Sequence, residues 1–119
     1  MGSLSVKTAR TGDRQTLIVT GELAMAGVTE LTAPAMDALA DRGVRSVVVD
    51  LAGVTFIDST GIGALVSLHG TAGDVGAQLI LRNPTARILE VLRIIHMDRT
   101  FLIDPPPPAA EGGTDQPGG

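Results

Sequence analysis

Apolar and polar residues alternate between strand-like and helix-like spacing from residue 4 to residue 103. The continuous apolar run from Val44 to Leu51 is the pattern of a strand that is central in a parallel sheet or covered on both faces. Gly12-Asp13 is typical of a hairpin turn between two earlier strands. The other predicted strands are residues 4–10, 15–19, 77–81 and, at an edge, 100–103.

A first amphipathic helix is indicated by the apolar stripe over residues 31–39, and Gly43 follows its end. Pro34 leaves two starts open, because proline fits the first turn of a helix but disturbs its interior. In one, Thr32 caps a short helix. In the other, a helix from about Val28 is kinked at Pro34.

Two further helices follow the apolar run, one over residues 62–72 and one over residues 88–95. For the later helix we expect Asn83 as the cap and Pro84 in the first position, where proline is favoured. Between these helices and the strands, residues 22–26 and the segment after Leu51 are expected to be loops.

Repeated strand-helix-strand units favour right-handed crossovers and a mostly parallel sheet. The expected fold is therefore α/β: a single domain at residues 4–103, with a sheet of four to five strands, an antiparallel N-terminal edge strand and three to four helices. Residues 104–119 are expected to form a disordered Pro/Gly-rich tail, because they offer too little apolar surface to offset ordering. Docking of the four prolines 105–108 in a polyproline-binding groove is the alternative.

Charge and composition narrow the functions that this chain can have. The 119 residues carry a net charge of -4, which argues against direct binding of nucleic acid or of an anionic membrane. The chain has no cysteine, no apolar stretch long enough to cross a bilayer and no signal-peptide pattern, so we expect a cytoplasmic protein. His69 and His96 lack ligand spacing, and no metal site is expected.

The segment Asp58-Ser59-Thr60-Gly61 precedes the apolar stripe of the second long helix. Asp58 or Ser59 in that position serves as a helix cap, and this structural role alone would account for the residues. The same position also suits a phosphate, because free backbone N–H groups and the positive end of the helix dipole converge there. The sequence leaves open whether Ser59 only caps the helix or is also phosphorylated.

Residues 49–63 (VDLAGVTFIDSTGIG), together with Gly21-Glu22-Leu23, resemble the STAS domain of bacterial anti-sigma factor antagonists. The resemblance extends over residues 4–103 and implies a STAS-like fold in the same element order. It also implies a cycle in which the unphosphorylated antagonist binds an anti-sigma factor, a GHKL-type serine kinase, and so releases a sigma factor. In the family the kinase phosphorylates the serine after the motif aspartate, here Ser59, and a PP2C-type phosphatase reverses the step.

The resemblance implies a binding module without a cofactor of its own, since ATP and magnesium belong to the kinase. We expect no enzymatic activity and a monomer or weak dimer. Family members commonly carry Asp directly after Gly-Glu-Leu, where this chain has Ala24. That change removes negative charge near Ser59 and puts kinase recognition in question.

Contacts with the partner are expected around Ser59. Glu22 is the candidate from the preceding loop, with a solvated turn carboxylate as its alternative. An exposed Ile62 or Leu65 would provide an apolar anchor, although burial in the core is the alternative, especially for Leu65. Met25 would add an adaptable apolar contact or cover the core. The full predicted contact set is Glu22, Met25, Asp58, Thr60, Gly61, Ile62 and Leu65.

Arginines 82, 87, 93 and 99 are expected chiefly as a solvated face, with contacts to acidic partner residues as the alternative. A different function class also stays open: STAS-like domains serve as subunits of stress-signalling assemblies or of membrane transport complexes, without a kinase cycle at Ser59. An enzyme or nucleotide binder is the weakest interpretation. The chain has neither a Gly-x-x-x-x-Gly-Lys loop nor a Gly-x-Ser-x-Gly elbow.

Overall fold

A five-stranded sheet with the strand order β1-β2-β3-β4-β5 organises the computed structural model, which describes residues 3–106. The first two strands are antiparallel, and every later pair is parallel. This is the α/β fold expected from the sequence, with the antiparallel strand at the N-terminal edge. The elements are β1 (Leu4–Thr11), β2 (Arg14–Leu23), α1 (Val28–Ala40), β3 (Ser46–Ile57), α2 (Ser59–Asp74), β4 (Gln78–Arg82), α3 (Ala86–Ile94) and β5 (Leu102–Asp104).

Strands β1 and β2 form the predicted hairpin. Thr11 pairs with Arg14, so the turn consists of Gly12 and Asp13. Gly12 has φ +62°, a left-handed conformation that glycine adopts without steric cost.

Strands β2 and β3 are both longer than the sequence pattern predicted. The segment after Leu51 was expected to be a loop, but it continues β3 as far as Ile57. Residues 22 and 23 were likewise expected in a loop and end β2. These extensions pair with each other, Glu22 with Phe56 and Leu23 with Ile57, after register shifts near Gly21. Backbone pairing therefore extends both strands beyond their apolar runs, so that β2 ends shortly before α1 and β3 ends shortly before α2.

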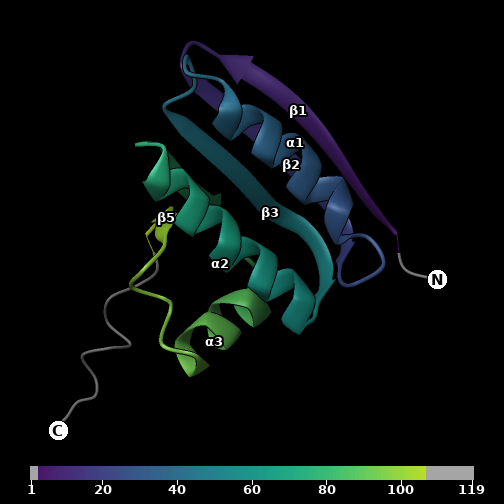
Figure 1. Ribbon diagram of the computed structural model, residues 1–119. Coiled ribbons are helices and arrows are strands. Elements are labelled where there is room, and N and C mark those ends of the chain that lie inside the picture. The colour runs from purple at the N-terminus through teal and green to yellow at the C-terminus, as the bar shows by residue number, and fades with distance from the viewer. Residues whose placement is uncertain (1–2, 107–119) are drawn as a thin grey trace, which may run out of the picture.

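Helices α1 and α2 lie side by side on one face of the sheet (Figure 1). Right-handed crossovers between neighbouring parallel strands produce this arrangement, since each connection then returns over the same face. β3 is the central strand, as predicted, and its Val47, Val49 and Leu51 are fully buried in the core. The core is almost entirely aliphatic; Phe101 is its aromatic member among the described residues.

The structure decides between the two predicted starts of α1 in favour of Val28, and it corrects the predicted cap of α3. α1 begins at Val28 and includes Pro34, so the short helix capped by Thr32 is wrong. α3 is capped by Thr85, whose hydroxyl accepts a hydrogen bond from the N–H of Ile88 at 3.2 Å, and not by Asn83. Asn83 instead has φ +50° and donates its N–H to the carbonyl of Asp104. A hydroxyl that reaches the third N–H of the helix thus decides where α3 starts.

The C-terminal end of the described chain is β5, which pairs with β4 at the sheet edge. Asp104, assigned above to the tail, is the last residue of β5. Residues 107–119, which hold most of the predicted tail, lie outside the described residues. Within residues 3–106, none of the helices combines the length and the apolarity that crossing a bilayer requires.

Candidate functional site

The start of α2 is fixed by Asp58, which occupies the N-cap position in an extended conformation. One carboxylate oxygen, Oδ1, accepts a hydrogen bond from the N–H of Gly61 at 2.9 Å. The other, Oδ2, accepts one from the N–H of Met25 at 3.2 Å. Asp58 therefore caps α2 and also ties the loop between β2 and α1 to the start of that helix.

Gly61 is required by the close approach of α2 to the end of β2. A Cβ atom at this position would lie 2.1 Å from the carbonyl oxygen of Leu23 and 2.9 Å from Cγ1 of Ile57. The first of these is a backbone atom, so the chain could make room only by moving the helix or the strand. Gly61 thus sets the position of the first turn of α2 against the carboxyl ends of β2 and β3.

Ser59 is the first residue of α2 and is exposed. Thr60 beside it is half-buried. A hydroxyl at this position stands where the unpaired N–H groups of the helix and the positive end of its dipole favour an anion. The structure thus places Ser59 at the start of the helix that the sequence pattern predicted.

Glu22 and Met25 lie beside the start of α2, one at the end of β2 and the other in the loop that follows. Glu22 is half-buried and pairs with Phe56 in the parallel register of β2 and β3. The side chain of Met25 is 74% exposed, so Met25 does not cover the core. The structure thus brings Glu22, Met25, Asp58, Ser59 and Thr60 together at one end of the sheet.

Ile62 and Leu65 do not form the exposed apolar anchor that was considered for them. Ile62 is 9% exposed and Leu65 is fully buried, and both belong to the core. The cause is the orientation of α2, which turns its apolar stripe toward β3 and β4. Gly61 is also buried. Gly61, Ile62 and Leu65 therefore pack under the surface that carries Ser59.

Phe56 is a residue of this region that the sequence analysis missed. It is 52% exposed near the end of β3, two positions before Asp58. A groove of about 160 Å³ runs between the end of β3 and the start of α3, and Phe56, Ile57 and Arg87 are among the residues that line it. The signal was hidden because Phe56 lies in a stretch that was assigned to a loop, next to apolar residues that are buried.

Hydrogen bonding lowers the pKa of the Asp58 carboxyl below its ordinary value. The largest cause is the hydrogen bond from the N–H of Gly61. Burial opposes it more weakly, and the N–H of Met25 adds a lowering effect that is smaller again. Asp58 is therefore ionised at neutral pH and places a negative charge next to Ser59. A phosphate on Ser59 would add about -1.5 to -2 charges beside it.

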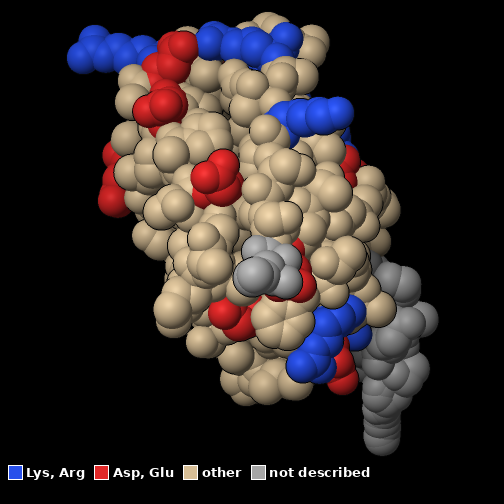
Figure 2. Space-filling view, turned by 90° about the vertical axis from the view of Figure 1, so that its right-hand side faces the viewer, with Lys and Arg blue, Asp and Glu red and all other residues tan. Residues whose placement is uncertain are grey.

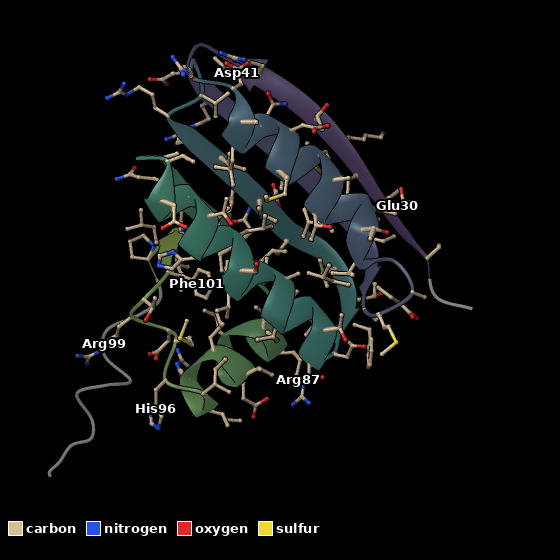
Figure 3. The ribbon with its side chains drawn as sticks, in the orientation of Figure 1. Glu30, Asp41, Arg87, His96, Arg99 and Phe101 are labelled. Atoms are coloured by element: carbon tan, nitrogen blue, oxygen red, sulfur yellow. The ribbon has the colours of Figure 1, made fainter. Side chains whose placement is uncertain are left out.

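Positive charge is concentrated at the other end of the molecule. Figure 2 shows most of the visible Lys and Arg side chains near the top, the end that carries the β1–β2 turn. Below them, Asp and Glu side chains are scattered among uncharged residues, and a smaller group of Lys or Arg atoms lies at the lower right. Arg10 at that end pairs with Asp41 at 2.7 Å. Near the start of α2, Arg87 extends outward from the first turn of α3 (Figure 3).

No group of three or more His, Asp or Glu side chains within residues 3–106 is placed to hold a metal ion. His69 instead packs edge-on against Phe101, with ring centroids 5.2 Å apart. The chemistry of the site is that of a surface hydroxyl at a helix start.

Comparisons with known proteins agree with this fold. The family model described as "Mlab, STAS domain" matches residues 6–104. A STAS-domain containing protein of Pseudomonas aeruginosa is 36% identical over 59 residues, which are 50% of this chain and 58% of that protein. The chain thus covers little more than half of that relative's length.

Solved structures of two anti-sigma factor antagonists have the same fold. Phosphorylated SpoIIAA of Bacillus has a TM-score of 0.68 at 19% identity, over 83% of this chain and 90% of that one. The antagonist of Mycobacterium paratuberculosis has a TM-score of 0.70 at 23% identity, over 86% of each chain. The murine anion transporter Slc26a9 also contains the fold, with a TM-score of 0.65 at 18% identity, over 79% of this chain and 18% of the transporter.

Proposed function

Because the chain belongs to the STAS domain family, we propose that it is an anti-sigma factor antagonist whose partner binding is switched by phosphorylation of Ser59. In its unphosphorylated form it binds an anti-sigma factor serine kinase of the GHKL type and so releases a sigma factor. Phosphorylation by that kinase ends the binding, and a PP2C-type phosphatase restores it. The chain acts as a binding module and catalyses no step itself.

The observation that carries this proposal is the exposed Ser59 at the first residue of α2, held in place by the Asp58 cap. A kinase needs its acceptor hydroxyl to be accessible and at a defined position, and the start of a well-anchored helix meets both conditions. The likeness to SpoIIAA, whose phosphorylated and unphosphorylated forms both have this fold, supports the same interpretation.

The switch follows from charge. The ends of β2 and β3 already bring Glu22 and Asp58 near Ser59, and a phosphate adds further negative charge at the same surface. The N-terminal end of α2 tolerates a phosphate, so the fold stays intact while the surface changes. A partner that fits the neutral hydroxyl would then face a desolvated charge and lose affinity.

Phosphate transfer tests the proposal. The full chain is incubated with a panel of GHKL-type serine kinases and ATP, and the phosphorylated residue is located by mass spectrometry. We expect transfer to Ser59 and none to the matched variant Ser59→Ala. Ser67, which is exposed on the same helix, is the internal control. Transfer to another residue, or to none with any kinase of the panel, would contradict the proposed switch.

A second candidate is a STAS subunit of a stress-signalling assembly or of a membrane transport complex, without a kinase cycle. The shared fold of the Slc26a9 anion transporter favours it, as does Ala24 in place of the family's usual carboxylate. Purification of the full chain from its native cell discriminates between the two. The second candidate is favoured if Ser59→Ala and Ser59→Asp co-purify with equal amounts of a transporter, or if both form the same large homo-assembly.

A further inference from the structure

We propose that the partner bound at Ser59 also inserts an apolar side chain flanked by a carboxylate into the groove between the end of β3 and the start of α3. In this arrangement Phe56 contacts the apolar group and Arg87 binds the carboxylate. The inference rests on the proposed function, because it describes how the same partner is recognised. It adds a second contact region that is separate from the phosphorylated hydroxyl.

The exposure of Phe56 is the first argument. The chain has two phenylalanines and no other aromatic residue except its histidines. Phe101 is 5% exposed, whereas Phe56 is 52% exposed. Val54 and Ile57 of the same strand are buried in the core, whereas Thr55 and Phe56 between them are exposed. Aromatic side chains offer a large contact area and are enriched at protein interfaces.

The groove is continuous with the start of α2, which is the second argument. Ile57 lines the groove, and its Cγ1 is also the atom that a Cβ on Gly61 would meet at 2.9 Å. The chain passes from Phe56 to Ser59 in three residues. A protein that covers Ser59 with a standard interface of roughly 800 Å² per partner would therefore reach the groove as well.

Charge defines the chemistry of the occupant. Arg87 lines the groove, and its ion pair with Glu90 spans 3.1 Å between side chains that are 71% and 60% exposed. Such an exposed pair stabilises the fold little, so a partner's carboxylate can replace Glu90. Around Ser59 itself, the carboxylate of Asp58 disfavours an acidic group. The groove therefore suits Leu, Ile or Met next to Asp or Glu.

Kinetics of phosphorylation test this contact, with the kinase that modifies Ser59 as the probe. Phe56→Ala and Arg87→Glu are expected to raise KM about tenfold and leave kcat unchanged, because they weaken binding without moving the acceptor hydroxyl. The matched controls are Ile94→Ala and Arg93→Glu, which change an exposed apolar residue and a cation in the last turn of α3. Equal KM values for the groove variants and the controls would overturn the proposal, provided that urea unfolding shows the variants folded.

A selection from random peptides displayed on phage, with the full chain as bait, separates this proposal from the phosphorylation cycle. With the wild type as bait, we expect the enriched peptides to carry an aliphatic residue beside Asp or Glu. These peptides should not bind to Phe56→Ser. With Arg87→Glu as bait, the enriched peptides should carry Lys or Arg in place of the acidic residue. Such a result supports the proposed contact in the groove even if no kinase phosphorylates Ser59; in that case only the proposed function fails. The proposed contact is overturned if the enriched peptides lack this pattern, or if they bind both variants as tightly as the wild type. This holds whether or not a kinase phosphorylates Ser59.

Discussion

The carboxylate of Asp58 joins two separate elements, because its Oδ2 accepts a hydrogen bond from the N–H of Met25 at 3.2 Å while its Oδ1 caps α2. The loop before α1 and the helix that carries Ser59 are thereby held in one position. A partner that touches both elements meets a surface that is already formed. We expect this carboxylate to matter more for the shape of the site than for direct contact.

Asp58→Ala removes the cap and the link to Met25. Loss of the N-cap carboxylate and of the second hydrogen bond is expected to lower the free energy of unfolding. Urea unfolding of the wild type and the variant measures the difference. Asp37→Ala is the control, since Asp37 is exposed inside α1 and should change stability by less than about 0.5 kcal/mol. An equal effect of the two substitutions would show that the cap is unimportant.

Acid should weaken the Asp58 contribution in a defined direction. The pKa of this carboxyl is lowered in the folded state, chiefly by the N–H of Gly61, so its ionised form stabilises the fold. That stabilisation is complete above the unfolded pKa of about 4 and is lost as the pH falls through the lower folded value. The difference in unfolding free energy between the wild type and Asp58→Asn should therefore shrink below about pH 4. A difference that grows on acidification would contradict this assignment.

Two glycines of α2, two positions apart, should respond in opposite ways to alanine. Gly61→Ala forces a Cβ against the carbonyl of Leu23 and should destabilise the protein by about 3 kcal/mol. Gly63→Ala meets open space in the helix and should stabilise it by about 0.5–1 kcal/mol through helix propensity. Thermal unfolding of both variants tests the pair. Similar melting temperatures would mean that α2 does not approach β2 as closely as described.

Leu65 and Met25 should separate stability from recognition. Leu65→Ala leaves a cavity in the core and should cost about 2–5 kcal/mol of unfolding free energy. Met25→Ala truncates an exposed side chain and should leave stability within about 0.5 kcal/mol while it weakens binding of the partner. Urea unfolding combined with titration calorimetry checks both variants. If Met25→Ala binds as tightly as the wild type, the loop before α1 is outside the interface.

The fold could be predicted from the sequence wherever an apolar run coincided with an element. The apolar run at residues 44–51 indicated the central strand because successive residues of β3, from Ser46 to Val49, are buried on both faces. Gly12-Asp13 indicated the hairpin because the turn needs a left-handed residue. The extension of β3 through Gly53 could not be predicted in this way. It depends on parallel pairing with the end of β2, which lies far away in the sequence.

The part of the candidate site that depends on neighbouring residues in the sequence could be predicted. Asp58 and Ser59 are at the helix start because a short acceptor side chain followed by an apolar stripe defines such a start. The burial of Ile62 and the exposure of Phe56 depend on how α2 and β3 lie against their neighbours. Local spacing carries no information on that packing, so Ile62 was overrated as a contact and Phe56 was missed.

Binding of the kinase to the full chain before and after phosphorylation of Ser59 tests the central claim most directly. Titration calorimetry should give an affinity at least about 100-fold lower for the phosphorylated protein, since like charges across an interface cost several kcal/mol. Ser59→Ala should bind like the unmodified wild type. Equal affinity of the phosphorylated and unphosphorylated proteins would contradict the account.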